Sequence, residues 1–340
     1  MEKQKAYFEH PGKAVETDAR FSHVMAISLD PRSNYREGVI RCITSREGDV
    51  EIKGYVDRSQ LYTVSRDSLD HFTVGDRLEI KNEKEILRKL TPEGWECIGL
   101  EDPDIWIDEK TELTHVYFTI PIKPPESKDK IRIHLGHAVG KDLHSLEMTE
   151  PVLLQNETMN ANAKEVSIAP TNAKGVRYNL IESRDREPKG RHSTVRVAIA
   201  EDMGGPWKYG NTVFHPAEHD IPWIAGHASP GPLLPKSSID VGEGKLLGIM
   251  NGREANQKLG DKIKYGMFSV GLFIYDYERG EIDWVSPEPF IRDSQAKTIT
   301  FASQFVETGP GTGILYAHVD DSFVRAYTLY SDKIKDLLPE

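Results

Sequence analysis

Residues 299–321 read ITFASQFVETGPGTGILYAHVDD, in which two apolar runs flank a turn rich in Gly and Pro. Short runs of β-branched and aromatic residues, bounded by Gly, Pro or Asp, are typical of two strands joined by a hairpin. The same plan recurs in four earlier segments, which start near residues 21, 101, 164 and 229. The starting points lie about 63 to 80 residues apart, and each interval is long enough for one four-stranded sheet. The sequence therefore predicts five similar β units.

Strand patterns dominate the whole chain. Short apolar or alternating runs occupy residues 23–29, 38–44, 114–120, 177–182, 194–199, 245–250, 267–277 and 313–319. The regular αβ alternation of a Rossmann or barrel-type α/β fold is missing. Only the final stretch, SDKIKDLLPE, has a helical pattern, with Ser331 as its cap. We therefore expect an all-β fold, a five-bladed β-propeller with a short C-terminal helix, formed by residues 1–340 as a single domain.

The amino-acid composition indicates which classes of binding partner are not expected. The chain has 43 Lys and Arg against 54 Asp and Glu, a net charge of −11, so nucleic acid and anionic membranes are not expected as partners. Two cysteines, Cys42 and Cys97, are too few for a disulfide framework or a Cys-rich zinc site, and no metal or cofactor is expected. The first residues contain no apolar run, which predicts a cytoplasmic protein; a secreted protein that has lost its signal remains an alternative. The sequence does not decide whether the chain forms a homo-oligomer.

The stretch GLEDPDIW, residues 99–106, is the sharpest candidate for chemistry. It places the carboxyl groups of Glu101, Asp102 and Asp104 within four residues. Close packing of carboxylates raises the pKa of one of them, which is how an enzyme keeps a general acid protonated near neutral pH. The alternative is an Asp-Pro turn in which these side chains accept hydrogen bonds from backbone amides.

This stretch resembles the Gly-x-Glu-Asp-Pro-Arg motif of glycoside hydrolase family 130, the β-mannoside phosphorylases and hydrolases. Further blocks resemble the family and follow in its order at residues 164–170, 178–184, 229–233, 244–252, 265–276, 286–289, 299–301 and 316–320. The resemblance extends over roughly residues 95 to 330 and implies a five-bladed propeller, in agreement with the repeat count. It also implies an enzyme that inverts the anomeric centre of a β-mannoside or a similar short oligosaccharide.

The resemblance implies roles for individual residues. Asp102 matches the family's general acid, Arg184 matches a residue that phosphorylases use on phosphate, and Asp320 matches an aspartate that contacts sugar hydroxyls. The set expected to bind substrate comprises Glu101, Asp104, Arg184, His227, Asn251, Arg253, Tyr265 and Asp320.

The departures from the family pattern concern cations. Asp104 stands where the family has an arginine, and the segment that ends in His227 lacks the expected lysine. Asn251 replaces a histidine of the family, and Arg253 follows closely. Because several cations are needed to hold a phosphate dianion, these changes favour water over inorganic phosphate as the nucleophile. Phosphorolysis and mannosyl transfer remain alternatives on the same scaffold.

An inverting hydrolase needs a second carboxylate to activate water, roughly 6.5 to 9.5 Å from the acid. Glu165 is the predicted base because it opens its unit as Asp102 does; Glu182, Asp104 and Asp320 are the other candidates. Aromatic side chains could stack on sugar rings or pack in the core, namely Trp106, Trp207, Tyr209 and Trp223. Two further alternatives are a propeller that binds glycans without catalysis and an arabinofuranosidase- or fructosidase-type enzyme.

Overall fold

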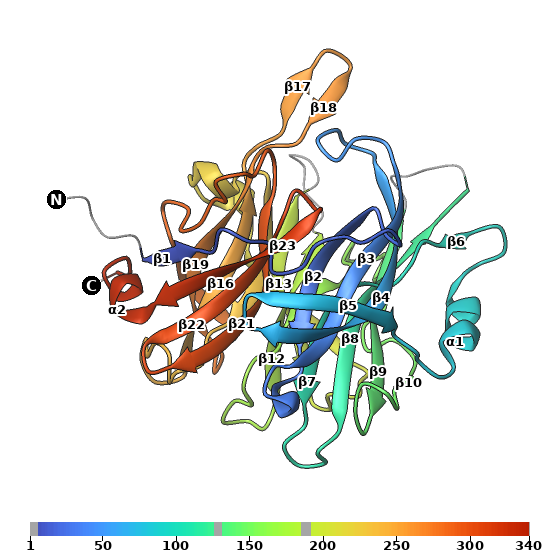
Figure 1. Cartoon of the computed structure of the whole chain (residues 1–340), viewed down its shortest axis with the longest axis horizontal. Coiled ribbons are helices and arrows are strands. Elements are labelled where there is room, and N and C mark those ends of the chain that lie inside the picture. Colours follow the sequence, from blue (N-terminus) through green and yellow to red (C-terminus); the bar gives the residue numbers. More distant parts are fainter. Residues whose placement is uncertain (1–5, 126–130, 185–191, 340) are drawn as a thin grey trace.

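The computed structural model describes residues 6–125, 131–184 and 192–339, and the chain is all-β, as predicted (Figure 1). Every predicted strand run overlaps a strand and starts within one residue of it, but several strands continue two or three residues beyond the predicted end. The strands form five units whose strands follow chain order, most of them with four antiparallel strands; the third and fourth units are joined into one eight-stranded sheet by a parallel bridge between β13 and β15.

The first unit contains β2 (His23–Leu29), β3 (Glu37–Glu47), β4 (Val56–Ser68) and β5 (His71–Arg77). The second contains β7 (Glu101–Ile107), β8 (Thr114–Lys123), β9 (Arg132–Gly140) and β10 (Glu147–Met148), with β6 (Glu96–Cys97) also paired to β8. The third contains β11 (Lys164–Ser167), β12 (Arg177–Arg184), β13 (Ser193–Ala200) and β14 (Lys208–Phe214).

The fourth unit contains β15 (His227–Leu233), β16 (Lys245–Arg253), β19 (Phe268–Asp276) and β20 (Glu281–Val285). The fifth contains β21 (Thr300–Gly309), β22 (Thr312–Val319), β23 (Phe323–Tyr330) and β1 (Tyr7–Glu9). The start of the chain thus supplies the outer strand of the last unit, where β1 pairs with β23. A small hairpin, β17 (Gln257–Leu259) and β18 (Lys262–Lys264), projects away from the sheets (Figure 1).

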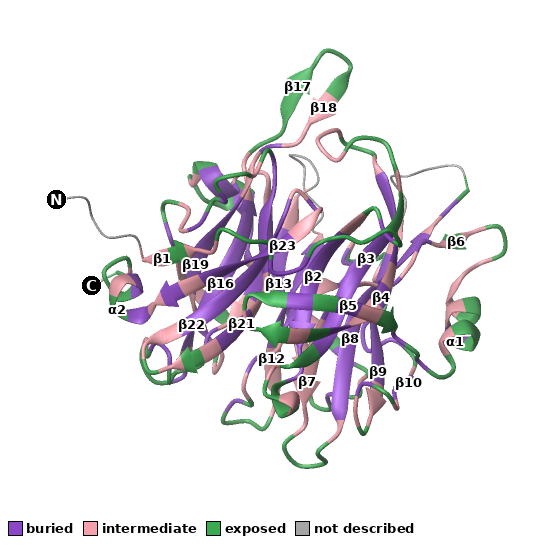
Figure 2. Ribbon diagram, in the orientation of Figure 1, coloured by how far each residue is buried: buried purple, intermediate pink, exposed green. Residues whose placement is uncertain are grey.

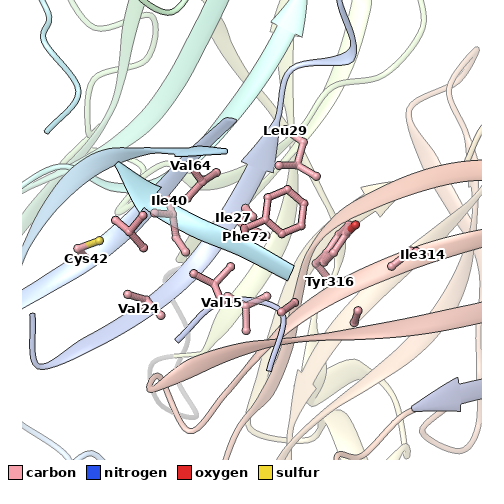
Figure 3. Packing of buried hydrophobic residues seen from close by; sticks show 14 of the residues in the cluster. Val15, Val24, Ile27, Leu29, Ile40, Cys42, Val64, Phe72, Ile314 and Tyr316 are labelled. Carbon is pink, nitrogen blue, oxygen red and sulfur yellow. The ribbon is translucent and has the colours of Figure 1, made fainter. Parts of the chain in front are cut away.

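The units pack against one another in a cyclic order. Their first strands contact each other in the sequence β2, β7, β11, β15, β21 and back to β2. Five apolar clusters lie between successive units, and one of them joins the fifth unit to the first. In that cluster Phe72 of β5 meets Tyr316 of β22, with ring centroids 5.6 Å apart, beside Val24 and Ile27 (Figure 3). Burial is concentrated in the inner strands, whereas the β17–β18 hairpin is largely exposed (Figure 2).

Two short α-helices flank the sheets. The predicted C-terminal helix is α2 (Ser331–Lys335), but its N-cap is Tyr330, so Ser331 is the first helical residue rather than the cap. The other, α1 (Glu83–Leu90), was not predicted, although it has acidic residues in its first turn, basic residues in its last turn and one buried apolar residue, Ile86. Within the described ranges no helix is long and apolar enough to cross a membrane.

Candidate active site

Each first strand contains a β-bulge that turns side chains toward the centre of the ring. The register shifts lie between residue pairs Met25/Ile27, Glu101/Asp104, Lys164/Ser167, Pro230/Leu233 and Ala302/Gln304. At the bulges the backbone φ is +48° at Asp102 and +52° at Glu165. A positive φ at a residue other than glycine costs about 1 kcal/mol or more, and such residues cluster at functional sites. The two predicted catalytic carboxyl groups therefore stand on strained backbone at equivalent places in neighbouring units.

A cavity of about 410 Å³, the main cavity, opens above these two carboxyl groups. Side chains from all five units line it, and the ionisable ones are Arg41, Lys53, Tyr55, Asp102, Lys164, Glu165, Glu182, Arg184, His192, His227, Arg253, Tyr265, His318 and Asp321. A second cavity of about 230 Å³ shares only Asp102 and Glu165 with the first. The Asp102–Glu165 pair therefore separates the two cavities.

Arg41, on β3 of the first unit, holds the carboxyl groups that open the second unit. Its guanidinium donates hydrogen bonds to Asp102 Oδ1 at 2.8 Å, to Glu101 Oε1 at 2.7 Å and to Ser59 Oγ at 2.9 Å. Burial raises the pKa of Glu101 to about 7, and the charge of Arg41 opposes that effect. Bonds to an ionised donor in a buried site are strong and directional, so Arg41 fixes where the Asp102 carboxylate lies.

Gly99 allows the second unit to approach β4 closely enough for this contact. Its φ is +143°, and a Cβ atom there would lie 2.0 Å from the carbonyl oxygen of Ser59. No L side chain fits such a position, which explains why the motif that precedes Glu101 begins with glycine. The close approach of the backbones brings Arg41 beside Asp102.

Asp102 and Glu165 form a hydrogen-bonded pair whose pKa values move in opposite directions. Burial, the negative charge of Asp102 and that of Glu182 raise the pKa of Glu165 well above its ordinary value. Burial also acts to raise the pKa of Asp102, but the charges of Arg41 and Lys164 and the hydrogen bond from Glu165 outweigh it and lower that pKa. Two carboxyl groups in contact cannot both ionise, so they share one proton.

This arrangement does not fit Glu165 as the predicted base. A base must be ionised to accept a proton, and in an inverting hydrolase it must stand far enough from the acid, roughly 6.5 to 9.5 Å, to leave room for water and sugar. Burial and the charges of Asp102 and Glu182 raise the pKa of Glu165, and its carboxyl group is hydrogen-bonded directly to Asp102. The pair is suited to proton donation instead.

The main cavity is also lined by an ionised carboxylate, Glu182 on β12. His227 Nε2 lies 2.9 Å from Glu182 Oε2, and Lys164 Nζ lies 3.4 Å from the same oxygen. Burial acts to raise the pKa of Glu182, but His227, Lys164 and a hydrogen bond from Ser193 lower it far below the ordinary range. Lys164 Nζ is also 3.9 Å from Glu165 Oε1, so one ammonium group stands between a protonated and an ionised carboxyl group.

The fifth unit contributes a buried His–Asp pair. His318 Nδ1 accepts the backbone N–H of Ala26 at 3.3 Å, so its proton resides on Nε2, which lies 3.1 Å from Asp321 Oδ1. The hydroxyl of Tyr55 donates to Asp321 Oδ2 at 3.3 Å. Asp321 thus offers the cavity a fixed, ionised acceptor of the kind that binds sugar hydroxyls.

Arg253 and Tyr265 form the cationic side of the cavity with Arg184. The Arg253 guanidinium stacks on the rings of Tyr265 and Phe268, at 4.4 and 5.4 Å from their centroids. Within the described parts of the chain no carboxylate lies within ion-pair distance of Arg253. Its positive charge is therefore available to a bound ligand.

Three of the predicted substrate contacts lie elsewhere. Asp320 is outside both cavities, and its carboxylate accepts the backbone N–H groups of residues 297, 298 and 299; its neighbour Asp321 lines the main cavity instead. Asn251 bonds the backbone N–H and carbonyl of Ala302, at 2.8 and 2.9 Å, and also lines neither cavity. Glu101 contacts Arg41 and not the cavity.

Asp104 lines the second cavity rather than the main one. Burial raises the pKa of Asp104 to about 7, and hydrogen bonds to the backbone of Ile105 and to Ser28 oppose it. The prediction that Asp104 repels phosphate beside the acid therefore needs correction, because its side chain faces the other end of the ring.

The aromatic candidates are not sugar platforms in the main cavity. Trp207 and Trp223 are 4% exposed and donate their indole N–H groups to the carbonyls of Asp202 and Ser286. Trp106 lines the second cavity, and Tyr209 donates its hydroxyl to the carbonyl of Leu154.

Sequence reasoning missed Arg41, His318 and Asp321 as members of the site. Arg41 lies in a strand pattern of the first unit, before the region that resembles the family, and no local motif marks it. Asp321 was quoted only as the last residue of the 299–321 repeat. The repeat itself was the available signal, because His318 lies near the end of β22 and Asp321 lies in the turn that follows it.

Comparisons with known proteins were made for sequence and structure. No protein-family model matches the chain, and no curated protein matches its sequence. A β-1,2-mannobiose phosphorylase from Listeria innocua, solved with β-1,2-mannobiose, matches with a TM-score of 0.65 at 12% identity, over 98% of this chain and 99% of that one. The chain has the fold of that enzyme.

Two other solved structures have a similar fold. One belongs to glycoside hydrolase family 130, a family of mannoside phosphorylases that contains hydrolases targeting β-1,2-mannosidic linkages in Candida mannan. It matches with a TM-score of 0.65 at 16% identity, over 95% of this chain and 93% of that one. The other is a mannose phosphorylase from Leishmania mexicana in complex with phosphate, with a TM-score of 0.52 at 15% identity, over 95% of this chain and 86% of that one. The predicted resemblance to the family is confirmed for the fold.

Proposed function

We propose that the protein is a glycosidase-type enzyme that cleaves β-mannosides or similar short oligosaccharides with inversion. The five units, residues 1–340, form a single five-bladed propeller whose central channel holds the site. The cyclic contacts of the first strands and the cluster that joins the fifth unit to the first support this architecture. The sugars bound or cleaved by the proteins of like fold support the substrate class.

The observation that carries the proposal is the pairing of the Asp102 and Glu165 carboxyl groups at the boundary of the main cavity, with the pKa of Glu165 raised by burial and by the neighbouring charges. A glycosidic oxygen departs readily only when it receives a proton, and a carboxyl group kept protonated near neutral pH can supply it. Arg41 and Lys164 stabilise the negative charge that the pair acquires once the proton has left. The pair is therefore the general acid of the reaction.

Water is the proposed nucleophile. Arg41 and Lys164 lie within ion-pair distance of carboxylates and are neutralised by them. Phosphorolysis is the second candidate, and the specific observation that favours it is the presence of two more guanidinium groups, those of Arg184 and Arg253, along the cavity.

The test is incubation with manno-oligosaccharides with and without inorganic phosphate, followed by analysis of the products and their anomeric form. We expect turnover without phosphate and release of free mannose. Strict dependence on phosphate, with mannose 1-phosphate as the product, would establish phosphorolysis instead.

A matched pair of variants tests the acid. Asp102→Asn should lower kcat by at least about 10²-fold, whereas Asp220→Asn on the exposed surface should not change it. If the wild-type protein binds mannosides but turns over none of a broad panel, it is a glycan-binding protein and the proposal is wrong.

A further inference from the structure

Glu165 is paired with Asp102 in the proposed acid, so the activation of water requires another group. His227, the first residue of β15, lines the main cavity with Glu182 on β12. Its Nε2 atom lies 2.9 Å from Glu182 Oε2, and the side chains of His227 and Glu182 are 12% and 3% exposed. A neutral imidazole held against a buried carboxylate is the arrangement by which histidine bases are oriented in hydrolytic enzymes.

The contact favours one tautomer of His227. The two atoms are within ion-pair distance but outside hydrogen-bond geometry. A nitrogen lone pair and a carboxylate oxygen repel each other at this distance, so the contact favours the tautomer with the proton on Nε2 and the lone pair on Nδ1. In the described part of the chain, no hydrogen bond uses Nδ1 of His227. The ring of Phe268 lies 5.0 Å away at 70° and fixes the plane of the imidazole. His227 therefore has a basic nitrogen free to accept a proton.

We propose that His227, oriented by Glu182, is the general base that activates the attacking water; this rests on the proposed hydrolytic function. Nδ1 takes one proton from water while the water oxygen forms a bond to the anomeric carbon. The bond from that carbon to the leaving oxygen breaks, and the leaving oxygen takes the proton of the Asp102–Glu165 pair. His227 then returns its proton through solvent to the pair, so the reaction consumes one water and no other reagent.

The charges around His227 suit this role. The groups that face it are Glu182 on β12, Lys164 on β11, Arg253 on β16 and, along the same cavity, Arg184 and His192. Burial lowers the pKa of His227, with Arg253 and Lys164 acting in the same direction, and Glu182 opposes them. The imidazole is therefore neutral at neutral pH, and Glu182 stabilises the imidazolium that forms when it accepts a proton.

Glu182 is a poorer base than its partner. The neighbouring His227 and Lys164 hold its pKa far below the ordinary range, and a weakly basic group gains little by taking a proton from water. Glu182 is accordingly a positioning residue, and its carboxylate acts on the reaction through the imidazole.

The test compares His227→Asn and His227→Gln with His144→Asn, which alters an exposed histidine that also faces a glutamate, Glu37. Both His227 variants should lower kcat for manno-oligosaccharide hydrolysis by about 10²- to 10⁴-fold, remove the acidic limb of the pH profile, and retain a cooperative melting transition. Imidazole added to His227→Ala should restore part of the rate. Glu182→Gln should shift the acidic limb to lower pH, because the carboxylate that raises the pKa of His227 has gone.

The outcomes separate this inference from the proposed function. An active wild-type enzyme whose His227→Asn variant keeps the same kcat and pH profile would overturn the base role alone. Loss of activity in Glu182→Gln without loss in His227→Asn would assign the base to Glu182. A wild-type protein that hydrolyses no mannoside, or that requires phosphate for every turnover, would overturn the hydrolytic function and the base role together.

Discussion

Arg41→Met tests the ion-pair cluster beneath the main cavity. Arg41 is 8% exposed and is the donor that holds both Asp102 and Glu101. Methionine has nearly the same length and no charge, so the substitution leaves two buried carboxyl groups without their cation. Breaking a buried pair by removing one partner costs about 3–5 kcal/mol, because the remaining charge is uncompensated.

The expected change in melting temperature follows from chain length. Unfolding entropy near 2.1 cal/mol/K per residue amounts to about 0.7 kcal/mol/K for a chain of 340 residues. A loss of 3–5 kcal/mol therefore lowers Tm by about 4–7 °C. The matched control is Arg58→Met, whose guanidinium is 32% exposed and pairs with Glu47 and Glu96 on the surface. That change should cost at most about 1 kcal/mol.

The lowered pKa of Asp102 determines how the stability loss of Arg41→Met depends on pH. Burial acts to raise the pKa of Asp102, but Arg41 and Lys164 lower it in the folded protein. A lowered pKa contributes stability that is present above the ordinary value near 4 and is lost as pH falls through the folded value. Arg41→Met removes part of that contribution, so the Tm difference from wild type should be larger at pH 7 than at an acidic pH below the folded value of Asp102.

Calorimetry of the wild type and the two variants at both pH values is the assay. Equal losses for Arg41→Met and Arg58→Met, or a loss for Arg41→Met that does not shrink at the acidic pH, would refute the buried-pair reasoning. Either result would mean that water already screens the charges of Asp102 and Glu101 in the folded protein.

Three other substitutions probe single features. Glu165→Gln should leave Tm nearly unchanged, because the side chain is already neutral and glutamine keeps a donor toward Asp102, while kcat falls at least about 10²-fold; a Tm loss as large as that of Arg41→Met would show that Glu165 is ionised. Gly99→Ala should lower both Tm and kcat, because its Cβ would lie 2.0 Å from the Ser59 carbonyl oxygen; normal activity would show that the backbones can separate. Asp320→Ala should destabilise by about 1–3 kcal/mol and leave KM unchanged, since its carboxylate caps three backbone amides; a raised KM at constant Tm would restore its predicted sugar contact.

The fold was readable from sequence because strand signals are local. A period-2 pattern, the composition of a hairpin and its recurrence at regular intervals need no knowledge of distant residues, and every run predicted as a strand lies in one. The helix α1 was missed although its charges and its buried Ile86 follow the same local rules. It is one amphipathic segment among many β patterns, and composition did not separate it from a loop.

The site was only partly readable from sequence. Several predicted site residues line the main cavity, namely Asp102, Glu165, His227 and Arg253. Three of them, Asp102, Glu165 and His227, lie at the start of a unit, as the repeat pattern predicts. Asp320 lies in the turn after β22 and Asn251 lies in β16, and both side chains bind backbone groups instead of lining the main cavity. Asp104 lies beyond the bulge at Asp102 and so faces the second cavity.

Sequence alone determined the class of fold, the five units and the candidate acid at Asp102. Tertiary structure decided what the carboxyl groups do. Burial, Arg41 from another unit and the contact between Asp102 and Glu165 set which of the two holds the proton, and His227 meets Glu182 although they are 45 residues apart in the chain. Protonation depends on desolvation and on charges within a few ångströms, and those neighbours come from different units, so no local pattern of residues could specify them.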